Sequence, residues 1–524
     1  MSEKTPHIDD VKQLHGMGYA QELSRRMSGF SNFAISFSII CILAGGITTF
    51  QLALSGAGGA GVGIGWPVGG LFAIIVALSM GQIASAYPTA GGLYHWSSIL
   101  GGKAWGWATA WFNLLGLIFV VSSVAAGAFI LFENLVLNGI LGIDVSGAAW
   151  QASGIGLPGW IWLLGVGLIL ISYAIFNHFG IRLTTLLTDF SGYWIFIVAI
   201  VLTVALLAFA VIAGQGLDFS RLVTFTNYTG DAGGGVWPQT SSILYAFVVG
   251  LLLVTYTVTG YDASAHTSEE THQAAVNVPR GMWQAVFWSV LFGYFMVCAF
   301  VLAMPSVADG AKQGANVFGW LMAASPMPGL LRDLLYVGIV IANYLCGLAG
   351  LTSCSRMMYA FSRDGGLPLS KPLSTISPKY RTPTIAIWVS AALAFISCLY
   401  GQAFTVLAAG CAVFLYISYI MPVAAGILAE GKTWKEKGPF NLGQLSKPNA
   451  VLAILGGLVL IWVGFQPPNQ LVGYLVVGLL VFMGIYWFAF ERTRFAGPPT
   501  GEQIAARQGA IAEIEAKLEQ GAAD

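Results

Sequence analysis

The stretch Ser36-Phe37-Ser38-Ile39-Ile40-Cys41-Ile42-Leu43-Ala44-Gly45-Gly46-Ile47-Thr48-Thr49 lies inside a hydrophobic run, yet it carries two adjacent glycines and several hydroxyl residues. A second run, Tyr256-Thr257-Val258-Thr259-Gly260-Tyr261-Asp262-Ala263-Ser264, has the same character and adds an acid. A simple membrane anchor would prefer leucine at such places, because each glycine weakens a helix by about 1 kcal/mol relative to alanine. We therefore expect both helices to unwind, the first at Gly45-Gly46 and the second around Thr257–Gly260.

Unwound backbone inside a bilayer is tolerated only where it lines a cavity or meets a ligand. One half of such a helix offers carbonyl groups, and the other offers N–H groups at a positive dipole end. That arrangement would bind a carboxylate and an ammonium group together. The alternative is that these glycines only allow two helices to pack closely. The two interruptions lie five spans apart, as in a five-plus-five inverted repeat, and this spacing favours a binding site.

The composition is that of a membrane protein. Of the 524 residues, 56% are hydrophobic and 9% are charged, against about 25% charged in ordinary soluble proteins. The mean hydropathy is +0.76, so the lipid bilayer is the expected solvent. A net charge of zero gives no electrostatic attraction to nucleic acid. The six cysteines lie in apolar segments without metal-ligand spacing, so we expect no metal and no cofactor.

Runs of about 20 apolar residues predict membrane-spanning helices. The sequence contains twelve, approximately at 30–52, 67–88, 104–131, 158–177, 186–213, 240–265, 282–304, 331–361, 383–400, 402–427, 450–466 and 470–490. We therefore predict an all-α polytopic protein with twelve transmembrane helices. The Gly- and Ala-rich stretch 53–65 is expected to be a mobile outer connection.

The distribution of lysine and arginine predicts the orientation. If the N-terminus is inside, all of the 23 basic residues except Arg221, Lys312 and Arg332 fall on the inner side. Both termini are then cytoplasmic. The predicted organisation is a cytoplasmic segment 1–29, a core 30–427 with spans 1 to 10, spans 11 and 12 within 428–490, and a cytoplasmic tail 491–524. We expect the end of the tail to be a short exposed helix or disordered.

Four motifs resemble the amino acid–polyamine–organocation (APC) superfamily, and specifically its amino acid/choline transporter branch. They are Gly18-Tyr19-Ala20-Gln21-Glu22-Leu23 with Met27-Ser28-Gly29-Phe30-Ser31-Asn32-Phe33-Ala34, Ala84-Ser85-Ala86-Tyr87-Pro88-Thr89-Ala90-Gly91-Gly92-Leu93-Tyr94, Gly260-Tyr261-Asp262-Ala263-Ser264-Ala265-His266 with Glu269-Glu270, and Ser353-Cys354-Ser355-Arg356 with Ser362-Arg363-Asp364-Gly365-Gly366-Leu367-Pro368. The resemblance covers about residues 18–490. It implies a LeuT-type fold and a permease that moves amino acids or related amines across the plasma membrane.

The resemblance also implies roles for individual residues. The backbone N–H groups of Ala44, Gly45 and Gly46 would bind the substrate carboxylate. Carbonyl groups around Thr257, Val258, Thr259 and Gly260 would receive its amino group. Tyr256 stands where relatives carry an aromatic gate, although an ordinary packing aromatic is the alternative. The oligomeric state and the exact substrate, whether a neutral amino acid, γ-aminobutyrate (GABA), choline or a polyamine, stay open.

Asp262 is the candidate for proton coupling. An acid in the middle of a span costs about 2.5–3.5 kcal/mol and is usually functional, and some relatives carry such an acid here. The alternative is a carboxylate satisfied by neighbouring hydroxyl groups. Thr352 and Ser353 lie where sodium-coupled relatives hold an ion, although membrane hydroxyls often bond to their own backbone. Some proton-coupled relatives carry a lysine in span 5, and this chain has none there.

Two other classes of function compete with a carrier. A membrane-embedded enzyme would need convergent nucleophile, base or metal groups, and the six histidines form no HExxH motif. Glu269 and Glu270 could pass for a catalytic carboxylate pair, but their position near Arg280 favours an ion pair in a cytoplasmic loop. A sensor would carry an added signalling domain. We therefore expect a transporter and not an enzyme.

Overall fold

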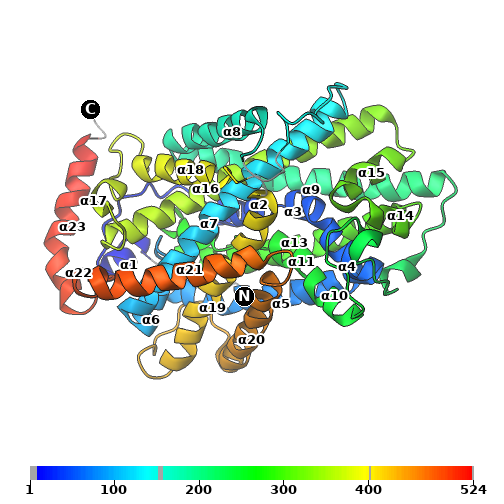
Figure 1. The fold of residues 1–524 in the computed structure, drawn as a ribbon. Coiled ribbons are helices and arrows are strands. Elements are labelled where there is room, and N and C mark those ends of the chain that lie inside the picture. Colours follow the sequence, from blue (N-terminus) through cyan, green and yellow to red (C-terminus); the bar gives the residue numbers. More distant parts are fainter. Residues whose placement is uncertain (1–8, 152–156, 401–402, 522–524) are drawn as a thin grey trace, which may run out of the picture.

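The computed structural model describes residues 9–151, 157–400 and 403–521. Within these ranges the protein is a bundle of helices without any β-strand (Figure 1). A helix satisfies its own backbone hydrogen bonds, which lipid cannot do, and so the apolar runs of the sequence fold in this way.

Ten helical segments are long and apolar enough to cross a membrane. They are Gly29–Thr48, Gly65–Ala86, Lys103–Asn138, Trp160–His178, Ile181–Ile212, Ala274–Ala303, Gly329–Arg363, Val406–Ala429, Gly443–Gly464 and Gln470–Arg494. Two shorter apolar helical segments, Ile243–Thr257 and Thr384–Ser397, coincide with the predicted sixth and ninth spans. The polytopic all-α class is therefore confirmed, while the count of twelve spans stays a prediction.

Figure 1 labels most of the α-helices along the chain. The first half contains α1 (Asp10–Gly16), α2 (Gly29–Ile40), α3 (Ile42–Thr48), α4 (Phe50–Gly63), α5 (Gly65–Ala86), α6 (Leu93–Gly101), α7 (Lys103–Leu131), the π-helix η1 (Phe132–Asn138), α8 (Trp160–His178), α9 (Ile181–Ile212), η2 (Phe219–Leu222), η3 (Gly230–Gly233), α10 (Ile243–Gly250), α11 (Leu252–Thr257), α12 (Ala263–His266) and η4 (Ser268–Glu270). The second half contains α13 (Ala274–Ala303), α14 (Val307–Lys312), η5 (Gly314–Asn316), α15 (Val317–Ala324), α16 (Gly329–Arg363), α17 (Ser370–Leu373), α18 (Thr384–Ser397), α19 (Ala403–Ala429), η6 (Gly443–Leu445), α20 (Ser446–Gly464), α21 (Gln470–Tyr486), η7 (Trp487–Glu491), α22 (Arg492–Arg494) and α23 (Glu502–Gly521).

The centre of the bundle is built around α7, which packs against α16 and α19, and around α13, which packs against α5 and α2. Small residues allow these close approaches. A Cβ atom on Gly116 of α7 would lie 2.7 Å from the Leu415 side chain of α19. In contrast, α8, α9, α20 and α21 expose many large apolar side chains, as expected of surfaces that face lipid.

The two described ends of the chain meet at one end of the bundle, called here the terminal end. There α23 packs against α1 (left side of Figure 1). The tail forms a mostly exposed helix, in agreement with one of the two predictions for it, although Ile511 and Leu518 are buried. In contrast, the stretch 53–65 is not a loop, because most of it forms α4 and its residues are largely buried. The opposite end, which carries α4, α14 and α15, is called the far end.

Candidate functional site

The first predicted broken helix is interrupted, but at a different residue. Helix α2 ends at Ile40 and α3 begins at Ile42, and between them Cys41 has φ 23° and ψ 87°. Positive φ is uncommon for a residue other than glycine. The expected unwinding at Gly45-Gly46 is therefore wrong, because both glycines lie inside α3.

This shift changes which backbone groups are available. The N–H groups of Ala44 and Gly45 donate to the Cys41 carbonyl oxygen at 2.8 and 3.1 Å. The N–H groups of Ile42 and Leu43 lie in the first turn of α3, where a helix leaves its donors without intrahelical partners. The positive end of α3 therefore lies slightly before the predicted position.

The second helix is broken where the sequence indicates. Helix α11 ends at Thr257, residues 258–262 are not helical, and α12 begins at Ala263. Gly260 has φ 95°, and a Cβ atom there would lie 2.3 Å from Ile39 Cγ2, so only glycine fits. Within the described part of the chain, no donor bonds to the carbonyl oxygens of Thr257, Val258 and Thr259. These three oxygens are therefore available as acceptors.

The two breaks lie against each other around a small cavity of about 20 Å³. A Cβ atom on Gly45 would lie 2.7 Å from Thr257 Cα, so this glycine is what lets α3 approach α11. The lining consists of small, apolar and hydroxyl side chains, namely Ile39, Ile40, Ala44, Gly45, Val120, Ser123, Val124, Tyr256, Thr257, Thr259, Cys346 and Cys411. We call it the central cavity. Three of the predicted residues, Gly46, Val258 and Gly260, do not line it, and a Cβ atom on Gly46 would instead meet Met296.

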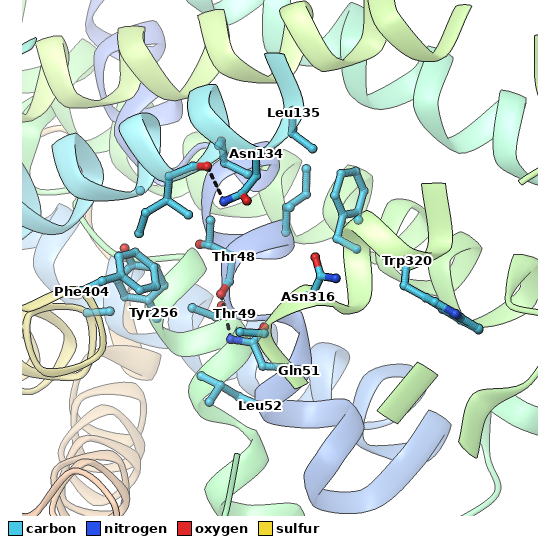
Figure 2. A pocket seen from close by; sticks show the side chains of 18 of the residues that line it. Thr48, Thr49, Gln51, Leu52, Asn134, Leu135, Tyr256, Asn316, Trp320 and Phe404 are labelled. Atoms are coloured by element: carbon cyan, nitrogen blue, oxygen red, sulfur yellow. Dashed lines mark hydrogen bonds between the residues drawn. The ribbon is translucent and has the colours of Figure 1, made fainter. Parts of the chain in front are cut away.

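A much larger cavity of about 740 Å³ lies between the central cavity and the far end (Figure 2). Its described lining has no acidic or basic side chain, and its polar groups are amides, hydroxyls and an indole: Thr48, Thr49, Gln51, Asn134, Asn138, Tyr256, Asn316, Trp320, Tyr336 and Asn469. We call it the vestibule. Tyr256 lines both cavities, and its hydroxyl lies 3.4 Å from Ser123 Oγ. It therefore stands at the boundary between them, which is the place expected of an aromatic gate.

Asp262 lines neither cavity, and its side chain is fully buried. Its carboxylate oxygens contact Tyr419 Oη at 2.7 Å, Asn113 Nδ2 at 2.9 Å and His266 Nε2 at 3.2 Å. These three residues come from α19, α7 and α12, and none of them was predicted to have a role, although His266 ends one of the quoted motifs. A polar residue in the middle of an apolar span, such as Asn113, was the available signal.

The terminal end is closed by buried ion pairs. Arg356 of α16 holds Glu270 through two contacts of 3.1 Å, and Arg363 holds Glu269 at 2.9 and 3.0 Å. The predicted loop pairing with Arg280 is therefore wrong, since both glutamates are fully buried and reach α16. Burial raises the pKa of Glu270 despite Arg356. Burial acts in the same sense on Glu269, but Arg363 and the Ala90 N–H outweigh it and lower that pKa.

Tyrosines and the N-terminal segment complete this closure. The hydroxyl groups of Tyr19 and Tyr94 both donate to Asp364 Oδ2, at 2.7 and 3.0 Å. Burial raises the pKa of Asp364. The Arg25 guanidinium donates to the Ser268 carbonyl oxygen at 3.0 Å. Segments far apart in the sequence are thus joined at the terminal end.

The two hydroxyl groups of the predicted ion site differ in their hydrogen bonds. Thr352 Oγ1 donates to Asn177 Oδ1 at 2.7 Å. Ser353 Oγ is buried and has no hydrogen-bond partner within the described part of the chain. Thr352 Oγ1 uses its hydrogen in this bond but keeps lone pairs that can bind a cation, so the oxygens of both Thr352 and Ser353 stay candidates for the ion site.

Comparison with known proteins places this architecture in a family. Residues 27–490 match the family described as amino acid permease. The chain belongs to that family. It is 33% identical to amino-acid permease BAT1 of Arabidopsis thaliana over 93% of its own length and 95% of the relative, and equally similar to the BAT1 homolog of Oryza sativa. An uncharacterized amino-acid permease of Schizosaccharomyces pombe is 29% identical over 85% of this chain and 77% of its own.

Family membership confirms the resemblance to the APC superfamily. The permease is a multi-pass membrane protein that transports amino acids, and not an enzyme.

Proposed function

We propose that this permease moves amino acids or related amines such as GABA across the plasma membrane by proton-coupled symport with alternating access. One observation carries the proposal. A small cavity between two broken helices has a wide vestibule with uncharged polar groups on one side and buried ion pairs on the other. A carrier needs such a site, reachable from one side of the membrane at a time.

The substrate would bind between the two breaks. Its carboxylate would meet the positive end of α3, close to the predicted Ala44–Gly46. The donors would be the N–H groups of Ile42 and Leu43, since those of Ala44 and Gly45 already donate to the Cys41 carbonyl oxygen. Its amino group would meet the carbonyl oxygens of Thr257–Thr259, which accept no other hydrogen bond from the described residues. Tyr256 would close over the bound substrate from the vestibule.

The proposed motion follows a LeuT-type arrangement. Residues 30–427 would form two inverted five-helix repeats, with spans 1, 2, 6 and 7 rocking against the remaining core and spans 11 and 12 outside it. The segments 1–29 and 491–524 would both be cytoplasmic. The terminal end is then the inner side, and the described conformation is open to the outside.

Asp262 would carry the coupled proton. A buried carboxyl group in a span disfavours its charged form unless partners compensate for it. A sodium-coupled symporter or an exchanger of choline or polyamines is the second candidate, and the unpartnered Ser353 hydroxyl favours it.

The test uses purified permease reconstituted in vesicles. Amino acid uptake is measured under an inward proton gradient without sodium, and under an inward sodium gradient at equal pH. We expect accumulation with the proton gradient alone. Accumulation that requires the sodium gradient would identify sodium, and not the proton, as the coupling ion. Loss of that sodium dependence in a Ser353→Ala variant would then identify the ion site. No uptake of any amino acid or amine under either gradient would reject the proposed symport.

A further inference from the structure

Asp262 does not stand alone, because His266 lies one helical turn further along the chain. The two side chains are both fully buried, and His266 Nε2 lies 3.2 Å from Asp262 Oδ2. Neither side chain lines the central cavity or the vestibule. The pair lies between the second break and the glutamates Glu269 and Glu270 of the terminal end.

The hydrogen-bond partners determine where hydrogens sit on the imidazole ring. His266 Nδ1 lies 3.1 Å from the Ala90 carbonyl oxygen. A carbonyl oxygen only accepts, so Nδ1 must carry a hydrogen. In a neutral ring Nε2 would then be an acceptor, facing a carboxylate oxygen that is also an acceptor. The Nε2–Oδ2 contact therefore requires one further proton between the two groups.

The surroundings of Asp262 indicate which side of the contact holds that proton. The Tyr419 hydroxyl accepts a hydrogen bond from the Gly260 N–H at 3.1 Å and uses its own hydrogen toward Asp262 Oδ1 at 2.7 Å. The Asn113 amide donates to Oδ2 at 2.9 Å. Each carboxylate oxygen thus already accepts a hydrogen bond from a group other than His266, and such bonds favour the ionised form of a carboxyl group. The proton therefore belongs to His266, and the pair is an imidazolium and a carboxylate with no net charge.

No lysine or arginine within the described ranges contacts this pair. The other titratable groups nearby are phenols: Tyr419 of α19, with Tyr261 and Tyr416, whose rings pack against it at centroid distances of 4.9 and 5.3 Å. Helix α7 contributes the uncharged Asn113, and the chain before α6 contributes the Ala90 carbonyl. Among the described residues, His266 is therefore the only counter-charge of Asp262.

We propose that Asp262 and His266 together form the proton site of this permease, with the transported proton on His266 Nε2. Tyr419 and Asn113 are positioning residues that hold the carboxylate. The inference rests on the proton coupling proposed above. It replaces a single acid by a pair, and it assigns the described conformation to the proton-loaded state.

The proton-release step follows from the charges. When His266 gives its Nε2 proton to water, a neutral imidazole remains, still bonded to Ala90 through Nδ1, beside an uncompensated Asp262 carboxylate. A lone buried carboxylate is strongly unfavourable. The proton should therefore leave only when the terminal end opens and water reaches the pair. Because Asp262 also joins α12 to α7 and α19, its charge is tied to the movement of the sixth span against those helices.

The experiment compares His266→Gln and Asp262→Asn with His272→Gln in vesicles. His272 is exposed and lies six residues further along the same stretch. With a gradient of about one pH unit, a carrier of one proton concentrates its solute about tenfold. We expect wild type and His272→Gln to reach that level. His266→Gln and Asp262→Asn should only equilibrate the solute, while retaining exchange of internal for external amino acid, which needs no net proton movement.

Gradient-driven accumulation by His266→Gln at the wild-type level would overturn the proton-site assignment. A wild-type protein that ignores the pH gradient would instead reject the proposed symport, so the two failures are distinguishable.

Two further measurements separate positioning from simple loss of structure. Tyr419→Phe removes a donor from the carboxylate, so the pair should bind its proton more tightly. The pH of half-maximal uptake should then rise, with little change in the KM for the amino acid, whereas Tyr416→Phe, one turn earlier on α19, should leave the profile unchanged. An unshifted profile for Tyr419→Phe would contradict its role.

Infrared difference spectra of the wild-type protein need no variant. On an increase in pH they should show loss of imidazolium. A change in a protonated carboxyl band would place the proton on Asp262 instead.

Discussion

The two ends of the bundle contain different kinds of polar side chain. The far end holds a vestibule of about 740 Å³ with amide and hydroxyl groups and no charged side chain in its described lining. The terminal end is filled by Arg356–Glu270, Arg363–Glu269 and the Asp364 cluster. Amides and hydroxyls exchange water for substrate without separating charges. Buried ion pairs, in contrast, are costly to separate unless water or a new partner replaces the lost one. We therefore call these ion pairs and the Asp364 cluster the latch, and we expect them to separate less readily than the uncharged polar groups that line the vestibule.

The largest effect is expected from breaking this latch on one side only. Arg363→Ala leaves Glu269 buried without its partner, and such a loss costs about 3–5 kcal/mol. The conformation in which the terminal end is closed should therefore become much less populated. A cysteine placed at the buried Thr89 should then react much faster with a thiol reagent added on the side of the terminal end.

Two controls make the result specific. Arg280→Ala removes an exposed arginine at the same end and should leave the Thr89→Cys labelling unchanged. The double variant Arg363→Met with Glu269→Leu removes both charges and should restore much of the protection, because replacing both partners by apolar groups is often neutral. Equal labelling of the Arg363→Ala and Arg280→Ala proteins would contradict the latch.

The sequence predicts the spans and the second break better than it predicts the latch. The apolar runs and the glycine at 260 locate the spans and the second break, since these depend on local composition. The latch could not be predicted in this way, because Arg363 and Glu269 are 94 residues apart and only the packing of α16 against the sixth span joins them. Local reasoning therefore paired the glutamates with the nearby Arg280.

The first break shows a different limit. Glycine pairs weaken a helix, and this made Gly45-Gly46 the expected site of unwinding. In the folded protein Gly45 instead provides room for Thr257, and the interruption falls on Cys41, whose positive φ is imposed by its surroundings. A close-packing glycine and an unwinding glycine have the same appearance in sequence. At Gly45 the close packing is observed, while the binding of substrate at this segment stays a proposal.

The next prediction concerns the contact between α3 and α11, which lies between the two ends. A Cβ atom at Gly45 would meet Thr257 Cα at 2.7 Å, which is backbone, whereas at Gly46 it would meet the flexible end of Met296 at 2.9 Å. Overpacking against a rigid neighbour costs about 1–3 kcal/mol. Gly45→Ala should therefore reduce amino acid uptake strongly, and Gly46→Ala only slightly, at equal amounts of inserted protein. Equal loss in the two variants would show that the approach of α3 to α11 does not shape the site.

The smallest effect is expected at Asp364, where the latch contains an acid without a bidentate arginine. Burial raises its pKa above the usual 3.8, so the closed end favours the protonated acid. Stability of the closed end is therefore lost as pH rises from the ordinary value through the raised one, and the cost persists at higher pH. Asp364→Asn keeps a neutral acceptor for Tyr19 or Tyr94 and removes this loss of stability with rising pH.

At neutral pH the Asp364→Asn variant should protect the Thr89→Cys reporter slightly better than the parent, by about 1 kcal/mol or less, which is the range of one hydrogen bond. The rise in labelling between acidic and neutral pH should also become shallower. Arg363 and Glu269 are unchanged in this variant, so any large opening would mean that Asp364 acts as a charged member of the latch. The comparison of the two ends would then have to include three ionic contacts and not two.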